Sequence, residues 1–369
     1  MYFKIVTNDS IPFKKRIKRT NLYFFVRYSS YRNWKNRFTT IFKLHPGYNN
    51  ALDKATERSH VKLWKVFRIK PSLNTLRICN NISNQTDKYI VPEEIFVSDI
   101  EPSLNNISEV KYISIKSFYN KWFDEGLFPK DYFHRINGEY LDQNLNPISK
   151  NDARNIAETI DFPVVLKPNY GSFGGDGVYF LENRKALLDK SDQLINFVVQ
   201  EKIDQHPDLS AYHNYGLNTC RVCVYKSVSN NQIHVLNAAL RMGVDGSLDN
   251  ETAGGIVSYI TTDGELHGFA VDKYGKKFFK HPNSGLTFDQ KIPNYDQLLE
   301  VSKQVAGRVY FARLVSLDLC YDCSGKWRPI EINLGGQTIR FAQYAGQPFF
   351  GDLTEEVIEY CIKNHWALK

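Results

Sequence analysis

Residues 166–178 read Leu-Lys-Pro-Asn-Tyr-Gly-Ser-Phe-Gly-Gly-Asp-Gly-Val, an apolar run that ends in a glycine-rich loop. Four of the seven residues from Gly171 to Gly177 are glycines. Because glycine has no Cβ, the backbone N–H groups of such a loop can converge on an anion, and Lys167 adds positive charge at the strand end. The pattern predicts a phosphate-binding loop, and the alternative is an ordinary glycine-rich turn.

The loop differs from the two common nucleotide-binding fingerprints. A P-loop closes on Gly-Lys-Ser/Thr, and the dinucleotide-binding pattern opens a helix at its third glycine. Here the residues Val178–Leu181 follow, and they are typical of a strand. The sequence therefore predicts two strands joined by the glycine loop.

A second pattern surrounds Glu331-Ile332-Asn333. The period-2 alternation of a strand puts Glu331 and Asn333 on one face. If Ser324-Gly325 form a two-residue hairpin turn, Asp318 lies directly opposite Glu331. Two carboxylates and an amide then converge, and such oxygen ligands suit Mg²⁺ completed by water and phosphates. The alternative is a polar, solvent-facing hairpin, although the opposite face would be apolar: Leu317, Leu319, Ile330 and Ile332.

Hydrophobic periodicity predicts a mixed chain of the α/β (α+β) class. We expect a helix over 115–127, with Phe118, Trp122 and Phe123 on one face, ended by Gly126 and Pro129. Further helices are expected over 185–195, 295–309 and 353–362. Strands are expected over 162–167, 197–200, 221–225 and 233–236, with the hairpin described above closing the set.

The composition is that of an ordinary globular protein: 369 residues, 42% hydrophobic and 24% charged. No stretch reads as a signal peptide or a membrane span, so we expect a cytoplasmic protein whose six cysteines stay reduced. The pairs Cys220/Cys223 and Cys320/Cys323 raise the alternative of a zinc site. Strand alternation disfavours it, because a spacing of three sends the two cysteines of a pair to opposite faces.

The net charge of +7 is unevenly distributed, since residues 1–70 hold 17 Lys and Arg against 3 Asp and Glu. A basic run, Lys14–Arg19, precedes several aromatic residues, and the combination suits an anionic membrane surface. The alternative is a solvated basic face. We expect no nucleic-acid partner, because no nucleic-acid-binding motif accompanies the charge.

Taken in order along the chain, these motifs resemble the ATP-grasp superfamily. The resemblance rests on Val165-Leu166-Lys167-Pro168 with its glycine loop, then Gln200–Ile203, Asp318 and Glu331–Asn333. Four further segments resemble the sugar-transfer-associated ATP-grasp family: Asn218–Arg221, Arg241–Gly243, Asp249–Ile256 and His281–Gly285. The likeness runs from about residue 90 to 350. Composition shifts between residues 70 and 110, where Pro71, Pro92 and Pro102 interrupt a polar stretch, so we expect a basic N-terminal region over 1–105. The resemblance implies two lobes over 106–205 and 206–369 that sandwich ATP.

The resemblance implies a role for each matching residue. Phosphates would be held by Lys167 and by Gly171, Ser172, Phe173, Gly174, Gly175 and Gly177. Adenine would meet the hinge Glu201, Lys202 and Ile203, and ribose would meet Asp208. The earlier ATP-binding lysine would be Lys116, with Lys121 and Lys130 as rivals.

The same resemblance implies the catalytic and metal-binding groups. Arg221 and Arg241 would neutralise the γ-phosphate and a developing acyl phosphate, and Asp318, Glu331 and Asn333 would hold two Mg²⁺ ions. The acceptor side would be lined by Asn250, Gly254, Gly255 and His281.

The implied activity is an ATP-dependent carboxylate–amine ligase that forms an amide through an acyl phosphate. Its partners would be a carboxylate-bearing sugar or glycan, such as a uronic acid of a surface polysaccharide or capsule, and an amine. The basic N-terminal region would dock at the inner face of the membrane. The alternatives are an ATP-grasp kinase that phosphorylates a hydroxyl and a non-enzymatic adaptor.

Overall fold

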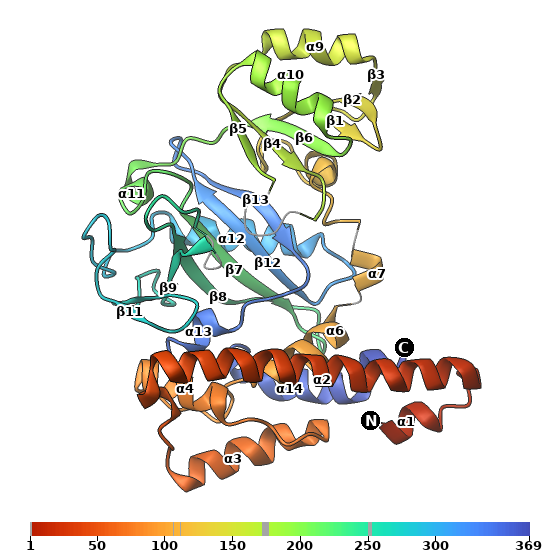
Figure 1. Ribbon diagram of the computed structural model, residues 1–369, viewed down its shortest axis with the longest axis vertical. Coiled ribbons are helices and arrows are strands. Elements are labelled where there is room, and N and C mark those ends of the chain that lie inside the picture. Colours follow the sequence, from red (N-terminus) through yellow and green to blue (C-terminus); the bar gives the residue numbers. More distant parts are fainter. Residues whose placement is uncertain (1, 106, 111, 172–176, 250–252) are drawn as a thin grey trace.

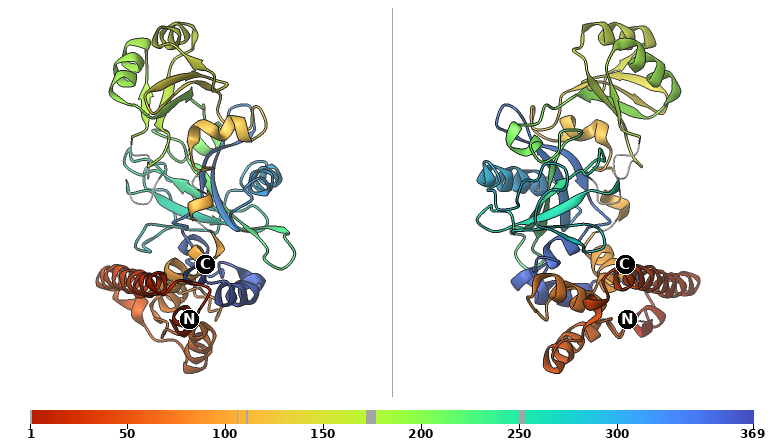
Figure 2. Two further views of the ribbon diagram at one scale, coloured as in Figure 1. Left: turned by 90° about the vertical axis from the view of Figure 1, so that its right-hand side faces the viewer. Right: turned by 60° about the vertical axis from the view of Figure 1, so that its left-hand side comes forward.

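The structure, a computed structural model, describes residues 2–105, 107–110, 112–171, 177–249 and 253–369. Three layers stack along its longest axis: an upper lobe, a middle lobe built on a large sheet, and a base of helices (Figure 1). Both chain termini lie at the level of the base (Figure 2). The two ends of the chain therefore belong to the same layer.

The upper lobe is an antiparallel sheet of six strands in the order β3-β2-β1-β6-β4-β5. The strands are β1 (Asp131–Ile136), β2 (Glu139–Asp142), β3 (Pro147–Ile148), β4 (Val164–Pro168), β5 (Tyr179–Leu181) and β6 (Phe197–Glu201). Two helices, α9 (Lys150–Thr159) and α10 (Arg184–Gln193), pack on it through Ala153, Ala157 and Leu187. Each helix begins at a side chain that accepts a backbone N–H, Ser149 for α9 and Asn183 for α10.

The middle lobe is an antiparallel sheet of seven strands in the order β11-β10-β9-β8-β7-β12-β13. The strands are β7 (Thr219–Lys226), β8 (Ile233–Met242), β9 (Ile256–Ile260), β10 (Ala270–Val271), β11 (Lys277–Phe278), β12 (Leu314–Tyr321) and β13 (Trp327–Asn333). Alternate residues of β7 enter different cores: Val222 packs in the core of α12 (Tyr295–Gly307), and Tyr225 packs in the core shared with the base. Both faces of the sheet are thus covered. Accordingly, every residue of β12 is buried.

The base consists of helices from both ends of the chain. They are α1 (Tyr2–Val6), α2 (Phe13–Leu44), α3 (Lys54–Trp64), α4 (Asn74–Ser83), α5 (Glu93–Ile95), the π-helical turn η3 (Phe96–Ile100), α6 (Glu101–Leu104) and α14 (Thr354–Lys363). Short 3-10 turns join or follow them: η1 (Pro46–Asn49), η2 (Lys65–Phe67), η6 (Gly351–Leu353) and η7 (Trp366–Leu368). No helix among the described residues is long and apolar enough to span a bilayer.

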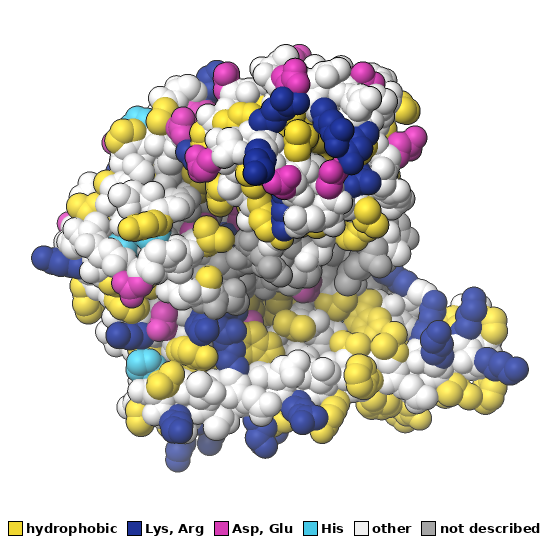
Figure 3. All heavy atoms as spheres, turned by 45° about the horizontal axis from the view of Figure 1, so that its top comes forward, with side chains coloured by type: hydrophobic (Ala, Val, Ile, Leu, Met, Phe, Trp, Pro, Cys, Tyr) yellow, Lys and Arg dark blue, Asp and Glu magenta, His cyan; other side chains and the backbone are white. Residues whose placement is uncertain are grey.

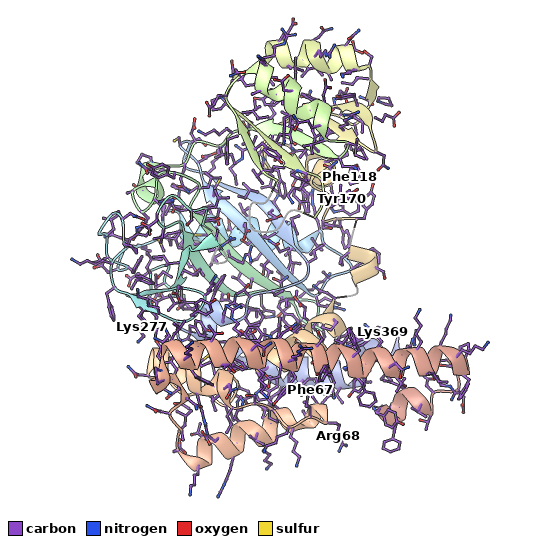
Figure 4. All side chains as sticks on the ribbon, in the orientation of Figure 1. Phe67, Arg68, Phe118, Tyr170, Lys277 and Lys369 are labelled. Atoms are coloured by element: carbon purple, nitrogen blue, oxygen red, sulfur yellow. The ribbon has the colours of Figure 1, made fainter. Side chains whose placement is uncertain are left out.

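A buried ion cluster ties the base together. Asp99 of η3 accepts hydrogen bonds from the guanidinium of Arg27 on α2, and His365 Nε2 lies 2.9 Å from its carboxylate. Arg27 also donates to the carbonyl oxygen of Phe67 at 2.8 Å, and Figure 4 shows Phe67 below α2. These partners come from both ends of the chain, so the cluster fixes the N-terminal region against the C-terminal residues.

The N-terminal region shares its core with the middle lobe. Trp64 and Phe96 from the base pack in one cluster with Leu314 of β12 and Phe350. Residues on both sides of position 105 therefore share a core, and the boundary expected there stays a prediction.

Most of the elements expected from periodicity are present, but the helix expected over 115–127 is wrong. The strands β4, β6 and β7 and the helices α10, α12 and α14 confirm the other expectations to within two residues at each end, whereas β8 begins at Ile233 as expected but continues six residues further, to Met242. Between 115 and 127 the chain forms only the 3-10 turn η4 (Lys116–Phe118) and one turn of helix, α8 (Tyr119–Trp122). The apolar residues do not share a face, because Phe123 is buried against Phe128 and Trp122 is exposed.

Four short helices complete the described elements: α7 (Ile107–Val110), α11 (Pro207–Ser210), α13 (Arg340–Gln343) and α8, given above. The segment with η4 is fixed to the upper lobe, since the backbone N–H of Lys116 donates to the carbonyl oxygen of Asn169 at 3.1 Å. Figure 4 shows Phe118 and Tyr170 at this junction between the lobes. The junction brings Lys116 to the candidate site.

Candidate active site

A cavity of about 1080 Å³ lies between the upper and middle lobes and reaches down to the base. The strands β4, β5, β7, β8, β12 and β13 line it, together with the segment that follows β6. Its size is at the upper end of the usual range for ligand pockets. Most of the residues expected to bind ATP and metal meet in this cavity.

Two lysines line the cavity from the upper side. Lys167 stands at the end of β4, and Lys116 enters from η4, with its Nζ 2.8 Å from Glu331 Oε1. Burial and the neighbouring charge of Lys116 lower the pKa of Lys167 to about 8. Lys121 and Lys130 are exposed and do not line the cavity, so the structure brings Lys116 to the site and not its rivals.

Only the two ends of the glycine loop lie within the described residues. Gly171 and Gly177 have φ of 75° and 73°, and a Cβ on Gly177 would lie 2.9 Å from Pro168 Cγ. Glycine is therefore required at position 177 by both conformation and space. The loop residues Ser172, Phe173, Gly174 and Gly175 lie outside the described residues.

In the hairpin β12–β13, Asp318 lies opposite Glu331, which confirms the prediction, but the loop length and the strand pairing near the loop differ from those expected. The two-residue turn is wrong: Asp322 pairs with Lys326 through a backbone hydrogen bond, so the loop is one residue longer. A bulge at Ile330 then restores the register, with Leu319 opposite Pro329 and Asp318 opposite Glu331.

The bulge also changes which side chains reach the cavity. Ile330, expected on the apolar face beside Ile332, lines the cavity with Glu331 and Asn333 instead. Ile332 remains buried in the core of the middle lobe. The bulge thus places the apolar side chain of Ile330 in the cavity wall beside Glu331.

Asp318 is held by both candidate arginines. Arg221 Nε and Nη2 donate to its two carboxylate oxygens at 2.6 Å each, and Arg241 Nη1 donates at 2.8 Å. Burial alone would raise the pKa of Asp318, but the two guanidiniums hold it below its ordinary value. Neighbouring strands fix this geometry, because Asp318 of β12 pairs with Arg221 of β7.

Asp318, Glu331 and Asn333 fit Mg²⁺ by the chemistry of their donor atoms. They offer two carboxylates and one amide, the hard oxygen ligands that Mg²⁺ prefers. Asn333 Nδ2 is buried without a hydrogen-bond partner among the described residues. Rotating this amide so that its oxygen faces a metal ion would therefore break no hydrogen bond of that nitrogen within the described part of the chain. Within the same residues no three His, Cys, Asp or Glu side chains converge, so phosphate and water oxygens would have to complete the shell.

The hinge residues Glu201, Lys202 and Ile203 line the cavity where β6 ends. The carboxylate of Glu201 accepts hydrogen bonds from the Lys130 backbone at 2.8 Å and from Arg328 at 2.7 Å. Its side chain therefore supports the hinge. Apolar side chains of Val165, Ile203 and Ile330 line the same cavity and can pack on a planar base.

Asp208 does not reach the cavity. It lies on α11, largely exposed, with its carboxylate 3.4 Å from His206 Nδ1. The side chains of Asp204 and Gln205 line the cavity instead. The expectation that Asp208 binds ribose is therefore not supported, because α11 carries it away from the hinge.

Three of the four acceptor residues expected from the resemblance are described by the structure, and none of the three lines the cavity: Gly254, Gly255 and His281. His281 is buried, and its Nε2 lies 2.9 Å from the carbonyl oxygen of Gly243, so it holds a loop in place. Burial lowers its pKa. Gly254 and Gly255 are absent from the described lining, and Asn250 lies outside the described residues.

Several lining residues were not expected from sequence. Asp249 accepts a hydrogen bond from the Thr219 hydroxyl and lies 3.6 Å from Arg241 Nη2, and burial raises its pKa. Asp249 directly precedes Asn250 in a segment that resembles the sugar-transfer-associated family, so the sequence could have indicated it as a site residue. Four others come from or face the N-terminal region, and no motif marks them: Trp34, Arg37, Glu93 and Arg340.

The cysteines lie as strand alternation predicts for β7. Cys220 is buried in the core with α12, whereas Cys223 is buried in the core with the base. All six cysteines are free thiols.

Two lobes around a cavity with paired lysines, an arginine-bound aspartate and a carboxylate–amide pair define an ATP-grasp protein. A profile of the sugar-transfer-associated ATP-grasp family matches residues 96–357, more than two thirds of the chain. The chain belongs to this family. No curated protein sequence matches it significantly.

Solved structures with a similar arrangement share little sequence with the chain. They include the biotin carboxylase domain of Hydrogenobacter thermophilus 2-oxoglutarate carboxylase with MgADP (12% identity, 70% of this chain and 46% of that one, TM-score 0.40). An L-amino acid ligase from Bacillus licheniformis has 12% identity, covering 68% and 48%, with a TM-score of 0.42. A biotin carboxylase from Campylobacter jejuni has 14% identity, covering 68% and 47%, also with a TM-score of 0.42. The chain spans about half the length of these three proteins.

Proposed function

We propose that the chain is an ATP- and Mg²⁺-dependent carboxylate–amine ligase that forms an amide through an acyl phosphate. The observation that carries the proposal is the joint placement of Asp318 between Arg221 and Arg241 and of Glu331 beside Lys116, in one cavity. These groups match what phosphoryl transfer requires, namely fixed positive charge and oxygen ligands for a metal.

Each group has a task in this reaction. Lys116 and Lys167 balance the charge of the ATP phosphates, and Arg221 and Arg241 stabilise the negative charge that develops as a carboxylate attacks the γ-phosphate. An amine then displaces phosphate from the acyl phosphate, leaving an amide, ADP and phosphate. Asp318, Glu331 and Asn333 would hold Mg²⁺, two ions in this proposal, which when bound neutralises phosphate oxygens.

The substrate part of the proposal is that the carboxylate belongs to a sugar acid of a surface polysaccharide or its precursor. Support comes from the family to which the chain belongs, whose description connects it with sugar transfer. That support is by analogy. The volume of the cavity, about 1080 Å³, leaves room for an acceptor beside the nucleotide.

Hydroxylamine trapping separates the ligase from a kinase with the same nucleotide site. During turnover with a uronic acid, an acyl phosphate reacts with hydroxylamine to give a hydroxamate, whereas a sugar phosphate does not. A phosphorylated hydroxyl without hydroxamate would favour the kinase and reject the ligase.

The product can be identified in cells. Surface polysaccharide from cells that express the wild type is compared by NMR and mass spectrometry with that from cells expressing Glu331→Ala. The matched control is Glu300→Ala, an exposed position on α12. Loss of an amide-linked substituent in Glu331→Ala alone would support the proposal, and identical glycans in all three would reject the polysaccharide as substrate.

We also propose that the N-terminal arm, α1 with the first half of α2, contacts an anionic membrane surface. Support comes from five apolar or aromatic side chains spaced 4, 7, 4 and 3 residues apart on α2, which places them on one helix face: Phe13, Ile17, Phe24, Tyr28 and Tyr31. All five are exposed, with Phe13 at 69%. Exposed basic side chains lie near them on the same helix: Lys14, Lys18 and Arg32. Figure 3 shows hydrophobic and basic side chains together on the projecting arm.

Vesicle sedimentation tests the membrane contact. The full chain is mixed with phosphatidylcholine vesicles with and without 30% phosphatidylglycerol. We expect binding only with the anionic lipid, weakened at high salt and by Phe24→Ser with Tyr28→Ser. Phe311→Ser removes an equally exposed aromatic residue outside the arm and is the control. Sedimentation unaffected by the α2 substitutions would reject the contact.

A further inference from the structure

A second cavity, of about 750 Å³, adjoins the candidate active site. Its described lining comes from three stretches of chain: the residues 210–215 at the end of α11, the loop after β8 and the loop after β11. Figure 1 shows α11 at the left edge of the middle lobe. Three residues line both cavities: Ser210, Asn214 and Tyr215. One extended ligand can therefore occupy the two cavities together.

Two of these stretches lead to the groups proposed to transfer phosphate. Tyr215 lines both cavities and shortly precedes Arg221 of β7. In the loop after β8, Asp245 lines the second cavity and Asp249 lines the first. Asp249 Oδ1 in turn lies 3.6 Å from Arg241 Nη2. A ligand that fills the second cavity would thus reach toward the site where the γ-phosphate is transferred.

The loops around the second cavity are fixed by the chain itself. Asn283 Oδ1 accepts the backbone N–H of Asp245 at 3.0 Å, and Asn283 Nδ2 donates to Asp245 Oδ1 at 2.9 Å. Behind them, His281 Nε2 lies 2.9 Å from the carbonyl oxygen of Gly243. A Cβ on Gly243 would lie 2.2 Å from the carbonyl oxygen of Ser247, so only glycine fits there. Loops that are ordered before a ligand binds lower the entropic cost of binding.

The chemistry of this lining suits a neutral ligand with many hydroxyl groups. Among its described residues there is one carboxylate, on Asp245, and no lysine or arginine. Asp245 is exposed, as are the amide of Asn214 and the hydroxyl of Ser284. Such groups accept hydrogen bonds from hydroxyls, and the amide and hydroxyl also donate them. A diphosphate is disfavoured, because it would meet a carboxylate without a cation to balance its charge.

Tyr215 supplies an aromatic surface where the two cavities meet. Its side chain is 80% exposed, so the core does not use it. The ring centre lies 5.7 Å from that of His213, whose Nε2 is held 2.9 Å from the carbonyl oxygen of Ser247. The negative face of an aromatic ring attracts the C–H groups on one side of a sugar ring.

We propose that the second cavity binds the sugar unit next to the sugar acid, with Tyr215 stacked on that unit. This inference rests on the proposed ligase function and adds that the acceptor is an oligosaccharide or polysaccharide, not a free or nucleotide-linked single sugar. The sugar acid lies in the active-site cavity with its carboxylate toward Arg221 and Arg241. Its neighbour passes Tyr215 and forms hydrogen bonds with Asp245 and Asn214.

Fragments of the natural acceptor test the subsite in the full chain. Surface polysaccharide from cells that express Glu331→Ala is cut by mild acid into fragments of one, two and four sugar units that carry the sugar acid. With Mg²⁺ and ADP saturating, calorimetry measures the binding of each fragment and of UDP-D-glucuronate. We expect the two-unit fragment to bind about tenfold more tightly than the single sugar acid and than UDP-D-glucuronate.

Tyr215→Ala should remove this advantage of length, whereas Tyr215→Phe should keep it, because the ring and not the hydroxyl stacks on the sugar. The matched control is Tyr310→Ala, which removes a tyrosine that is 65% exposed and is absent from the described lining of both cavities. Because Tyr215 is exposed, Tyr215→Ala should unfold at the same urea concentration as the wild type, which separates lost binding from lost stability.

Equal binding of the one-unit and two-unit fragments would overturn the subsite and leave the ligase in place. The same holds for tighter binding of UDP-D-glucuronate, or for an advantage of length that Tyr215→Ala keeps. If the wild type binds a fluorescent ATP analogue but no fragment, the polysaccharide is rejected as substrate and the subsite falls with it. If the wild type does not bind the ATP analogue, the ligase proposal itself fails.

Discussion

The ammonium group of Lys116 lies 2.8 Å from the carboxylate of Glu331. This ion pair joins the segment that leads into the upper lobe to the hairpin β12–β13 of the middle lobe, for which we propose a metal-binding role. From this position Lys116 would contact both the nucleotide phosphates and the groups proposed to hold the metal. The pair holds Lys116 in the cavity, whereas Lys121 and Lys130 are exposed and do not line it, so Lys116 is the lysine that we propose binds ATP.

Replacing Lys116 with methionine should weaken ATP binding by about tenfold to a hundredfold. The variant keeps the apolar stem but loses a charge-assisted hydrogen bond, worth about 1.5–3 kcal/mol, and each 1.4 kcal/mol is about tenfold in affinity. A fluorescent ATP analogue titrated in the presence of Mg²⁺ measures the change. Lys121→Met, at an exposed position nearby, should bind like the wild type. Equal dissociation constants for the two variants would remove Lys116 from the site.

The substitution Asp318→Asn should lower stability as well as activity. It leaves Arg221 and Arg241 buried without their shared carboxylate, and breaking a buried ion pair costs about 3–5 kcal/mol. Urea unfolding without metal or nucleotide isolates this effect. Glu331→Gln also removes a proposed metal ligand but should lose less stability, because Glu331 is more exposed and forms an ion pair with one basic residue, Lys116, in the described part of the chain. Similar unfolding midpoints for both variants would contradict the structural role of Asp318.

The contribution of Glu101 to the stability of the protein should fall as the pH rises from about 4.5 to 7. Burial raises the pKa of Glu101 from 4.5 to about 7, so the folded state binds a proton that the unfolded state releases earlier. Below about pH 4.5 Glu101 makes its full contribution to the free energy of unfolding, up to about 3 kcal/mol. This contribution is lost as the pH rises through about 7. Urea unfolding of Glu101→Gln at several pH values should show a weaker slope than the wild type. An unchanged slope would show that Glu101 does not titrate on unfolding.

The sequence was sufficient to predict the groups whose positions depend on neighbouring strands. Lys167 ends a strand, and Glu331 and Asn333 alternate along another, so local pattern decides where they point. The pairing of Asp318 with Glu331 was predicted correctly although the turn was not. The longer loop and the bulge at Ile330 shift the register in opposite directions, and neither leaves a clear mark in the sequence.

Residues that reach the site through tertiary packing were not predictable in this way. Arg37 lies on α2, nearly 300 residues from Glu331, and arrives at the cavity only because the base packs against the middle lobe. The structure does not bring Asp208 of α11 or His281 to the cavity, where the resemblance implied that they would lie. There the backbone path, and not the residue type, decides whether a side chain reaches the cavity.

The base should prove to be part of the folding unit. Ile41 on α2 is completely buried, and Ile41→Ala should cost about 2–5 kcal/mol, as expected for a cavity left in a core. Leu22→Ala on the same helix removes a similar side chain that is 46% exposed and should change stability by less than about 0.5 kcal/mol. A single unfolding transition, followed by far-ultraviolet circular dichroism and by tryptophan fluorescence, should shift as a whole in Ile41→Ala. An early transition of the helices alone, with the lobes unchanged, would show that the base folds independently and that the shared core with Leu314 and Phe350 contributes little to its stability.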